Sequence, residues 1–518
     1  MKRTNGAIVK NIAIIGTILV GIANLLYLPV NNLHPDEAYY WVWSHNLAWG
    51  YFDNSPMVAY VIRFFTSFGN SAFWVRLPAL LVWLWLVCFI YWFTKKLYKN
   101  SQAGFLALLI GLFVPLLTSG SHIMTHDIPL MFFTSLVFYF LYEAVEEGKK
   151  KAWYGVGIFL GFALFSKFQA ALLGVIILAM LLFRSSKRHW LTRKEPYWAA
   201  LISLLMFTPI LYWNATHRWA AFAFQFEHGI HRVMKLENLL EFWGGQALIF
   251  SLLFFALFYY AAKRTFSWQL RKAPDVFLMY SFLPIFLFFS FTSLTYPALP
   301  NWPAIAYLPS IIFLGAQLQR SFEYFGRIRR TLLWIFLIFS FGISTLLLTL
   351  VRYPELLISH LNINLPSEQV IANSTYGWSK LGQRVDQAID QYLPHQKVVP
   401  IFGDSYQVAA ELQYYVSKPA VFFTTREAHR CHFDYVTMDK IAEFNGQSGI
   451  LVIKDHLPPS AAKYFQEIAL VEHFAVKRFG QQVRDLYIYR FAKLDAPALY
   501  EMAANKPLGY PGKYKDPQ

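Results

Sequence analysis

Apolar runs of about 15 to 20 residues recur along the first two thirds of this chain, and they constrain its fold more than any other feature. Such a run is close to the length of α-helix that crosses about 30 Å of hydrocarbon. Over the whole chain 15% of the residues are charged, against about 25% in a soluble domain of average composition. We therefore predict a polytopic α-helical membrane protein with about eleven transmembrane helices. The expected spans are residues 11–33, 77–94, 103–119, 129–142, 154–166, 169–183, 197–213, 247–262, 276–294, 303–318 and 331–351.

The basic residues between these runs predict how the chain is oriented. Cytoplasmic loops of membrane proteins carry an excess of Lys and Arg. With a cytoplasmic N-terminus, the cytoplasmic segments up to residue 351 hold 22 Lys and Arg, and the opposite segments hold six. The net charge of +16 is therefore assigned to topology signals and contacts with membrane lipids, and no nucleic-acid partner is predicted.

The composition changes after Arg352, where charged and turn residues replace the long apolar runs. Short candidate strands lie at residues 398–402, 420–423, 450–454 and 485–490, and a helical stretch at 406–415 lies between the first two. We predict a transmembrane domain with outer loops over residues 1–351 and a small extracytoplasmic α/β domain over residues 352–518. Pro, Gly and Lys are frequent from Leu499 on, so a flexible C-terminal end is expected.

The stretch His34–Met57 brings the first carboxylates of the chain together with many aromatic residues. It reads HPDEAYYWVWSHNLAWGYFDNSPM, with Asp36 beside Glu37 and with Asp53 near its end. Aromatic faces stack on sugar rings, and carboxylates hold hydroxyl groups or accept protons. Because the predicted topology makes this loop extracytoplasmic, we expect a saccharide site at the extracytoplasmic surface of the membrane that the protein spans.

A second acidic loop and an intramembrane lysine extend this candidate site. Asp127 follows the third expected span, and Lys167 lies between two apolar runs, where a cation is costly unless it faces protein, water or a headgroup. Transfer of a sugar from a lipid phosphate needs positive charge at the leaving phosphate and a carboxylate near the anomeric carbon. We therefore predict that Lys167, with Arg76 and Arg232, contacts such a phosphate.

Each of these residues also has a structural interpretation. Asp36 could be the N-cap of a juxtamembrane helix, and Glu37 could be a charge of its first turn. Asp127, two residues before Pro129, is also typical of a helix start. Lys167 could extend its ammonium group to the headgroups, and the aromatic residues could form an interfacial belt.

No cofactor is assigned from the sequence. His228 and His231 are three residues apart, as in a metal-binding pair. A metal site needs a placed third ligand, which the sequence does not supply. A divalent metal therefore stays an alternative without a defined site.

The motifs as a set carry a family resemblance that covers most of the chain. They are Asp36-Glu37-Ala38-Tyr39-Tyr40-Trp41, Gly50-Tyr51-Phe52-Asp53, Pro56-Met57, Arg76-Leu77-Pro78, His126-Asp127-Ile128-Pro129, Ser166-Lys167-Phe168, Pro300-Asn301-Trp302-Pro303, Tyr376-Gly377-Trp378, Tyr406-Gln407, Glu411-Leu412 and Tyr414-Tyr415. This set resembles the polyprenyl-phosphate-sugar-dependent glycosyltransferases of the GT-C superfamily. The nearest group contains the lipid A aminoarabinose transferases and the lipopolysaccharide-core galacturonosyltransferases, with the protein O-mannosyltransferases further away.

The resemblance implies a GT-C fold in the bacterial inner membrane, with the active site and the C-terminal domain extracytoplasmic. It implies a hexosyl- or pentosyltransferase that uses a polyprenyl-phosphate-linked sugar donor and a cell-envelope glycan, lipid or protein acceptor, with inversion. Asp36 would be the catalytic residue. The residues assigned to substrate binding are Glu37, Asp53, Asp127, Arg76, Lys167, Arg232, Tyr39 and Trp43. The alternatives are a transporter or flippase of lipid-linked sugars, against which no internal repeat is evident, and a non-catalytic scaffold, which would leave the acidic motif without a role.

Overall fold

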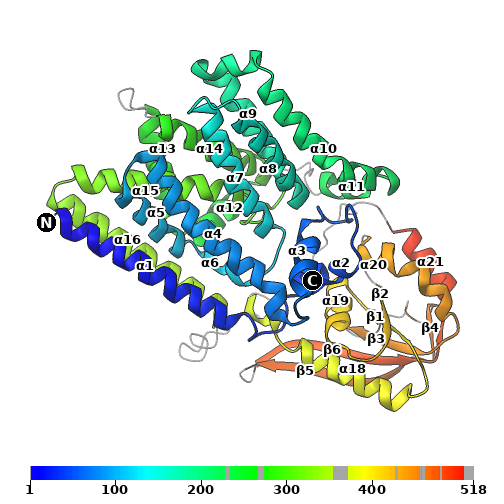
Figure 1. Cartoon of the computed structure of the whole chain (residues 1–518). Helices are drawn as coiled ribbons and strands as arrows, with labels where there is room; N and C mark the ends of the chain where they lie inside the picture. Colours follow the sequence, from blue (N-terminus) through cyan, green and yellow to red (C-terminus); the bar gives the residue numbers. More distant parts are fainter. Residues whose placement is uncertain are drawn as a thin grey trace. The chain divides into compact units, whose positions relative to one another are not determined.

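The chain forms two compact units that are interleaved along the sequence. The computed structural model describes residues 2–227, 234–266, 273–353, 371–425, 430–454, 457, 461, 463–478 and 481–506 (Figure 1). Unit 1 comprises residues 1–28, 76–212 and 229–349, and unit 2 comprises residues 29–75, 213–228 and 350–518. The loop segments 29–75 and 213–228 thus group with the C-terminal part. The predicted division into domains at residue 351 stays a prediction.

Unit 1 is built of α-helices, most of which lie close to the predicted apolar runs. Short 3₁₀ turns follow some of them, at η1 (Gly120–His122), η2 (Phe168–Ala170) and η3 (Ser185–Thr192). The helices are α1 (Lys2–Tyr27), α4 (Ala72–Tyr98), α5 (Ser101–Phe113), α6 (Pro115–Ser119), α7 (Asp127–Val145), α8 (Ala152–Ser166), α9 (Ala171–Phe183), α10 (Glu195–Thr216), α12 (Leu236–Ile249), α13 (Leu253–Phe266), α14 (Ala273–Ser293), α15 (Ala304–Tyr324) and α16 (Arg327–Arg352). The expected spans 103–119 and 247–262 are not single helices, because the chain bends between α5 and α6 and between α12 and α13.

The number of spans depends on how bent helices are counted. In the described part of the chain, six helices are long and apolar enough to cross a membrane: α1, α4, α7, α10, α14 and α16. Three pairs pass the same test together but are bent, α5 with α6 by 67°, α9 with η3 by 110° and α12 with α13 by 105°, which gives nine spans. The expected spans 154–166 and 303–318 are helical as α8 and α15, although they are not among these nine. The multispan helical fold is confirmed, and the count of eleven stays a prediction.

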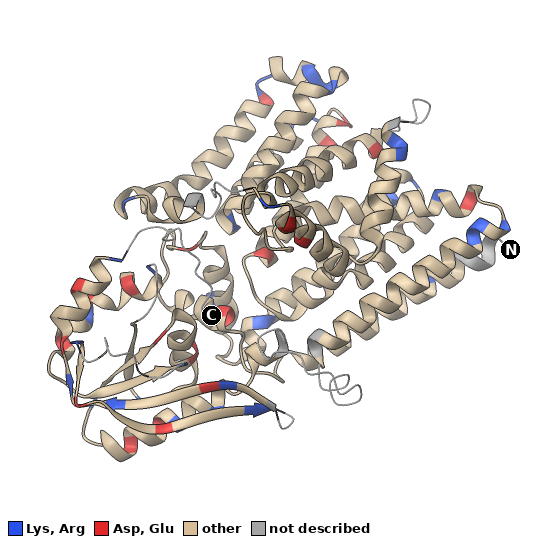
Figure 2. Cartoon of the chain, turned by 180° about the vertical axis from the view of Figure 1, so that it is seen from behind, with Lys and Arg blue, Asp and Glu red and all other residues tan. Residues whose placement is uncertain are grey.

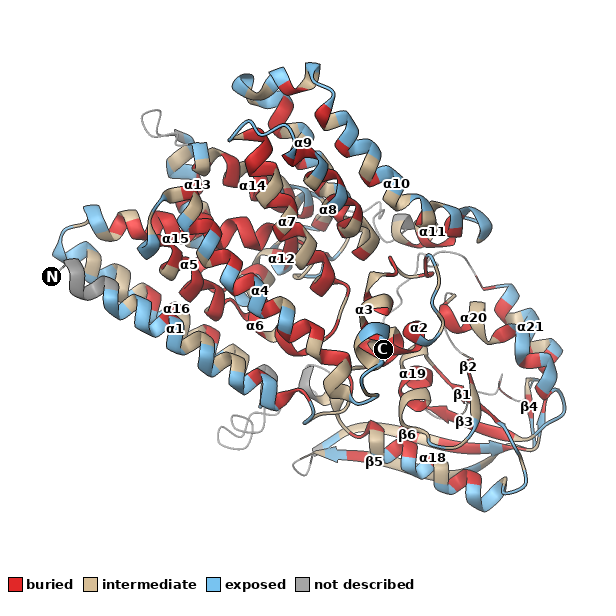
Figure 3. Cartoon of the chain, in the orientation of Figure 1, coloured by how far each residue is buried: buried red, intermediate tan, exposed pale blue. Residues whose placement is uncertain are grey.

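Helix α15 forms the centre of unit 1. All of its residues from Ala304 to Gln319 are buried (Figure 3). A Cβ atom added to Gly315 would lie 2.5 Å from the Cβ atom of Ala107 in α5, so glycine permits the two helices to pack closely here. Because α15 is covered on all sides, each polar group that it carries needs a partner within the protein.

Few charged residues lie along the helices of unit 1 (Figure 2), and several of them form ion pairs at helix ends. Glu143 lies 2.8 Å from Lys96, and Glu146 pairs with Arg184 and, at 3.0 Å, with Lys187. Both glutamates are almost fully covered. The excess of basic residues that predicts the cytoplasmic side is therefore partly compensated by acidic residues that the sequence analysis did not single out.

Unit 2 combines the loop segments with a C-terminal α/β part. Its helices are α2 (Pro35–His45), α3 (Met57–Thr66), α11 (Ala220–Glu227), η5 (Ile371–Thr375), α18 (Trp378–Tyr392), α19 (Tyr406–Tyr415), α20 (His432–Val436), η6 (Met438–Phe444) and α21 (Ala496–Ala504). Its strands are β1 (Val399–Gly403), β2 (Ala420–Thr424), β3 (Gly449–Ile453), β4 (Phe465–Gln466), β5 (Ala469–Arg478), β6 (Gln481–Phe491) and β7 (Lys493–Leu494).

Five of these strands form one mixed sheet in the order β2-β1-β3-β6-β5. Strand β1 pairs in parallel with β2 and β3, whereas β6 is antiparallel to β3 and β5. The inner strands β1 and β3 are buried at every position, as expected for apolar runs in a covered sheet. Aromatic residues, among them Phe402, Phe423 and Phe491, fill the core on one side.

The predicted α/β fold of the C-terminal part is confirmed. Each of the four candidate strands and the helical stretch at 406–415 is present. Strand β5 was not predicted; it lies at the edge of the sheet, and all but one of its residues are half-exposed or exposed. The flexible end was expected from Leu499, but α21 continues to Ala504; residues 507–518 lie outside the described residues.

Candidate active site

The acidic motif opens helix α2 through a capping box. The Nδ1 atom of His34 accepts a hydrogen bond from the backbone N–H of Asp36 (3.2 Å), and the carboxylate of Glu37 accepts one from the N–H of His34 (2.9 Å). Pro35 fills the first helical position, where no N–H is needed. The N-cap is therefore His34, and the interpretation of Asp36 as the N-cap is wrong.

This arrangement gives the two adjacent carboxylates different environments. Glu37 is fully buried and holds the start of α2, which is its structural interpretation; its role toward a substrate stays a prediction. The side chain of Asp36 is 36% exposed, and its carboxylate lies 3.8 Å from Nδ1 of His34. Asp36 is thus the carboxylate of this motif that a ligand can reach, on a helix whose first turn is fixed.

Asp53 is fixed by a hydrogen-bond relay. The hydroxyl group of Tyr39 donates to Oδ2 of Asp53 (2.6 Å) and accepts from the backbone N–H of His432 (2.8 Å). The side chain of Gln225 donates to the backbone carbonyl of Asp53 (2.6 Å). Burial, together with the charge of Asp53, raises the pKa of Tyr39 well above its ordinary value. Tyr39 therefore stays protonated and acts as a hydrogen-bond donor.

The aromatic residues of the motif form a packed cluster. Trp43 is fully buried and stacks on Tyr51, with ring centroids 4.1 Å apart. The ring of His432 lies 5.1 Å from that of Tyr51, and burial lowers the pKa of His432 to about 3, so the imidazole is neutral. Tyr39 is 2% exposed and packs 4.5 Å from Tyr406. The contacts of Tyr39 and Trp43 are those of core residues, and their predicted role in sugar binding stays a prediction.

The tyrosines of helix α19 hold this loop segment in place. The hydroxyl group of Tyr415 accepts a hydrogen bond from the N–H of Leu33 (2.8 Å), just before the acidic motif. Tyr414 donates to the carbonyl of Asn70 (3.1 Å), whose side chain accepts from the indole of Trp41 (2.8 Å). The C-terminal part therefore positions the segment that carries Asp36.

A second group of polar residues lies in unit 1. The ammonium group of Lys167 is 2.7 Å from Oδ1 of Asp127, and the amide of Asn301 donates to Oδ2 (3.2 Å). The side chains of Lys167 and Asp127 are 12% and 21% exposed. Lys167 is thus paired with a carboxylate, which lowers the cost of a cation between two apolar runs. Asn301 belongs to the Pro300–Pro303 motif, for which the sequence alone predicts no role.

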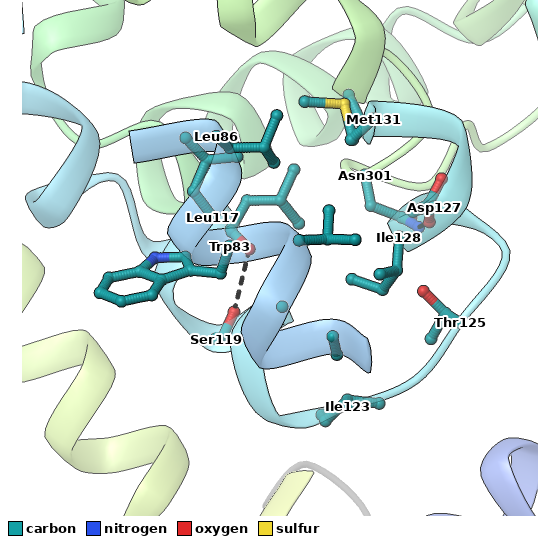
Figure 4. A pocket seen from close by; sticks show the side chains of 15 residues that line it. Trp83, Leu86, Leu117, Ser119, Ile123, Thr125, Asp127, Ile128, Met131 and Asn301 are labelled. Carbon is teal, nitrogen blue, oxygen red and sulfur yellow. Dashed lines mark hydrogen bonds between the residues drawn. The ribbon is translucent and has the colours of Figure 1, made fainter. Parts of the chain in front are cut away.

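An apolar cavity ends at this group (Figure 4). Its volume is about 190 Å³. Asp127, Asn301, Thr125 and Ser119 supply polar atoms to its wall. The other lining residues are Ala79, Val82, Trp83, Leu86, Leu116, Leu117, Gly120, Ile123, Ile128, Met131 and Ala304. The cavity therefore suits a molecule with an apolar chain and a polar end.

Of the other two predicted cations, the structure describes only Arg76. Arg76 is 2% exposed, and its guanidinium donates to the backbone carbonyl of Leu28 (3.0 Å), the residue that follows α1. This contact supports a structural role, and its contact with a phosphate stays a prediction. Arg232 lies outside the described residues, as do His228 and His231. Among the described residues, no group of three or more His, Cys, Asp or Glu side chains is arranged to hold a metal ion.

The described residues thus form a multispan helical unit, a mixed sheet and a helix that begins with an acidic motif. Residues 53–213 match the family described as dolichyl-phosphate-mannose-protein mannosyltransferase (PMT_2). The lipid A galacturonosyltransferase RgtD of Rhizobium johnstonii is 24% identical over 299 residues, which are 56% of this chain and 61% of RgtD. The match thus spans about three fifths of that relative.

Solved structures of ArnT from Cupriavidus metallidurans have the same fold. The form bound to undecaprenyl phosphate matches with a TM-score of 0.61 and 15% identity, over 92% of this chain and 97% of ArnT. The apo form matches with a TM-score of 0.59 and 17% identity, over 94% and 98%. The resemblance of this chain to the GT-C superfamily is therefore confirmed.

Proposed function

We propose that this chain is an integral-membrane glycosyltransferase that moves a sugar from a polyprenyl-phosphate donor to a cell-envelope acceptor on the extracytoplasmic face of the bacterial inner membrane. The observation that carries the proposal is the environment of Asp36. Its neighbour Glu37 is buried in the capping box, while the Asp36 carboxylate is 36% exposed at the start of a fixed helix. A reachable carboxylate on a rigid element is what a general base requires.

The cavity beside Asp127 supports a lipid-linked donor. Its apolar wall would take the first units of a polyprenyl chain, and Lys167 would meet the phosphate near the polar end. Because Lys167 is paired with Asp127, the incoming phosphate would compete with this carboxylate for the ammonium group, and Asp127 would then contact hydroxyl groups of sugar or acceptor. The solved ArnT structure with undecaprenyl phosphate supports the same class of donor.

The proposed reaction is a single displacement with inversion. An acceptor hydroxyl oxygen forms the new bond to the anomeric carbon, the bond from this carbon to the phosphate oxygen breaks, and Asp36 takes the hydroxyl proton. The leaving phosphate keeps the bonding electrons and is stabilised by cations. If the acceptor is itself a phosphate, no proton moves, and Asp36 stabilises positive charge at the anomeric carbon.

The acceptor to test first is lipid A, and the sugar to test first is galacturonic acid. Both are chosen because this chain is similar to RgtD, a lipid A galacturonosyltransferase. Basic residues outside the membrane would suit such an anionic acceptor.

The test is a transfer assay with the full-length protein in detergent. Without a sealed membrane a transporter cannot produce a glycosylated acceptor, so product formation separates a transferase from a flippase. General-base catalysis is typically worth about 10²–10⁴ in rate, and Asp36→Asn should lose about that much turnover while retaining donor binding. Activity of the folded variant within a few-fold of the unmodified protein would remove Asp36 from the mechanism.

Lys167 is tested separately, by donor binding. Lys167→Met removes the cation and should weaken binding of the polyprenyl-phosphate donor, because a charge-assisted contact to the phosphate is lost. Lys263→Met is a suitable control, since Lys263 is an exposed residue in the last turn of α13 and does not belong to the group around Asp127. Unchanged donor affinity in Lys167→Met would show that this residue does not hold the phosphate.

A further inference from the structure

A second polar group in unit 1, here called the Asp275 cluster, has no role in the proposed reaction. It consists of Tyr98 from α4, Arg264 from α13, Asp275 from α14, and Gln317 and Arg320 from α15. Helix α15 packs against both α13 and α14 (Figure 1). The charge distribution predicts that their ends at this cluster are cytoplasmic, which is the side opposite the acidic loops.

The carboxylate of Asp275 is saturated with donors. Its Oδ2 atom lies 2.6 Å from Nη1 of Arg320 and 3.7 Å from Nε of Arg264. Its Oδ1 atom accepts from the hydroxyl of Tyr98 (2.7 Å) and from the amide of Gln317 (3.0 Å). The side chain is 2% exposed. Asp275 therefore ties four helices together, and this structural role accounts for Arg320 as well.

That role accounts for the Nε atom of Arg264, but not for its two Nη atoms. Its Nε atom donates to the side-chain oxygen of Gln317 (2.8 Å). Its two Nη atoms donate to no acceptor among the residues that the structure describes, although the side chain is only 17% exposed. Two guanidinium groups face one carboxylate, so the cluster carries one net positive charge. A cation with unused donors in a largely covered position indicates an anionic ligand.

A cavity of about 290 Å³ lies directly at this guanidinium. Its polar end is formed by Arg264, Thr265 and Asp275, and its remaining wall by Val276, Met279, Tyr280, Leu283 and Pro284 of α14. The apolar wall continues along the same face of α14, because Leu287 and Phe291 follow at helical spacing and are 63% and 66% exposed. The cavity is thus cationic at one end and open along an apolar helix face.

We propose that this cavity binds an anionic phospholipid, with its phosphate at Arg264 and one acyl chain along α14. Basic pockets between transmembrane helices on the cytoplasmic side are suited to anionic headgroups. A zwitterionic lipid would leave the net charge of the cluster uncompensated, and a free phosphate would leave the apolar wall unused. The proposal does not depend on the sugar-transfer activity, which concerns the acidic loops and the cavity beside Asp127.

The test is native mass spectrometry of the full-length, delipidated protein in detergent. The probes are dioleoylphosphatidylglycerol, dioleoylphosphatidylcholine and inorganic phosphate. We expect one dioleoylphosphatidylglycerol molecule to bind several-fold more tightly than dioleoylphosphatidylcholine. Arg264→Gln should weaken its binding by about tenfold or more, the loss expected for a charge-assisted contact. Lys263→Gln removes the same charge from the exposed neighbouring residue and should leave affinity within about twofold.

A second variant keeps the test independent of the folding of Arg264→Gln. Met279→Trp narrows the cavity and retains every charge, and it should also weaken lipid binding by about tenfold. Equal losses in Arg264→Gln and Lys263→Gln would overturn the proposal, because the attraction would then be general surface electrostatics. Binding of inorganic phosphate as tight as that of dioleoylphosphatidylglycerol, or unchanged lipid affinity in Met279→Trp, would overturn it as well.

Discussion

His432 should make the stability of this protein depend on pH, because its imidazole is neutral when the protein is folded. The ring is 4% exposed among Trp43 and Tyr51, and burial lowers its pKa from 6.5 to about 3. Above about pH 6.5 neither the folded nor the unfolded chain is protonated at this residue, so it has no effect there. As the pH falls below 6.5, only the unfolded chain takes up the proton, and the free energy of unfolding decreases until about pH 3.

The expected decrease in the free energy of unfolding follows from the separation of the pKa values of His432 in the folded and unfolded chain. One pH unit in this interval corresponds to about 1.4 kcal/mol, so going from about pH 7.5 to about pH 5 removes roughly 2 kcal/mol. For a cooperative unit of about 150–250 residues this lowers the melting temperature by about 4–8 °C. The substitution His432→Phe keeps a ring of similar size but cannot be protonated, and the backbone N–H that bonds to Tyr39 is retained.

The assay is thermal unfolding of the full-length protein in detergent at both pH values. Other groups also titrate in this interval, so the informative quantity is the drop in melting temperature of the unmodified protein minus that of His432→Phe. We expect this difference to be positive and about 4–8 °C. His395→Gln, which removes an exposed histidine, should retain the full drop. If the melting temperature of His432→Phe drops as much between the two pH values as that of the unmodified protein, the reasoning about His432 is refuted.

Two further predictions concern packing and a buried ion pair. Gly315→Ala places a Cβ atom 2.5 Å from that of Ala107; overpacking of this kind typically costs about 1–3 kcal/mol, and a lowered melting temperature in detergent would be the readout. Lys506→Ala leaves the carboxylate of Asp434 without its ammonium partner at 2.9 Å in a position that is 4% exposed, which should cost about 3–5 kcal/mol. Lys493→Ala, at an exposed position of the same unit, is the matched control, and an equal shift in both variants would contradict the role of the ion pair.

The sequence allowed much of the fold to be predicted, because apolar runs and strand patterns are local. The bent pairs and the central position of α15 could not be predicted, since they depend on which helices surround a run. In α15, Gln317 and Arg320 lower the mean hydropathy of the helix, and only their contacts with Asp275 show how these polar groups are satisfied. Strand β5 was missed because its apolar residues come in two groups, ALV and FAV, and do not alternate with polar residues as in a half-buried strand.

For the candidate site, the residues near Asp36 and Asp127 could be predicted as acidic motifs, but their partners could not. The pairing of Lys167 with Asp127 joins residues 40 positions apart, and the bond between Tyr39 and His432 joins residues 393 positions apart. Hydrogen bonds of this kind leave no periodic signal in one sequence. The capping box is the exception: Glu37 three residues after His34 is a local pattern, although histidine is an uncommon N-cap.

The interleaving of the two units has a consequence for synthesis of the protein. Residues 29–75 leave the ribosome early, yet Leu33 bonds to Tyr415, 382 residues later, and Tyr39 bonds to His432. Almost the whole series of membrane helices is therefore inserted before the acidic segment can acquire its partners. During that interval the apolar side chains around Trp43 have not yet been covered by the C-terminal part, which is the state in which large proteins are prone to misassembly. The late helices α19 and α20 thus determine when the acidic segment can reach its folded arrangement.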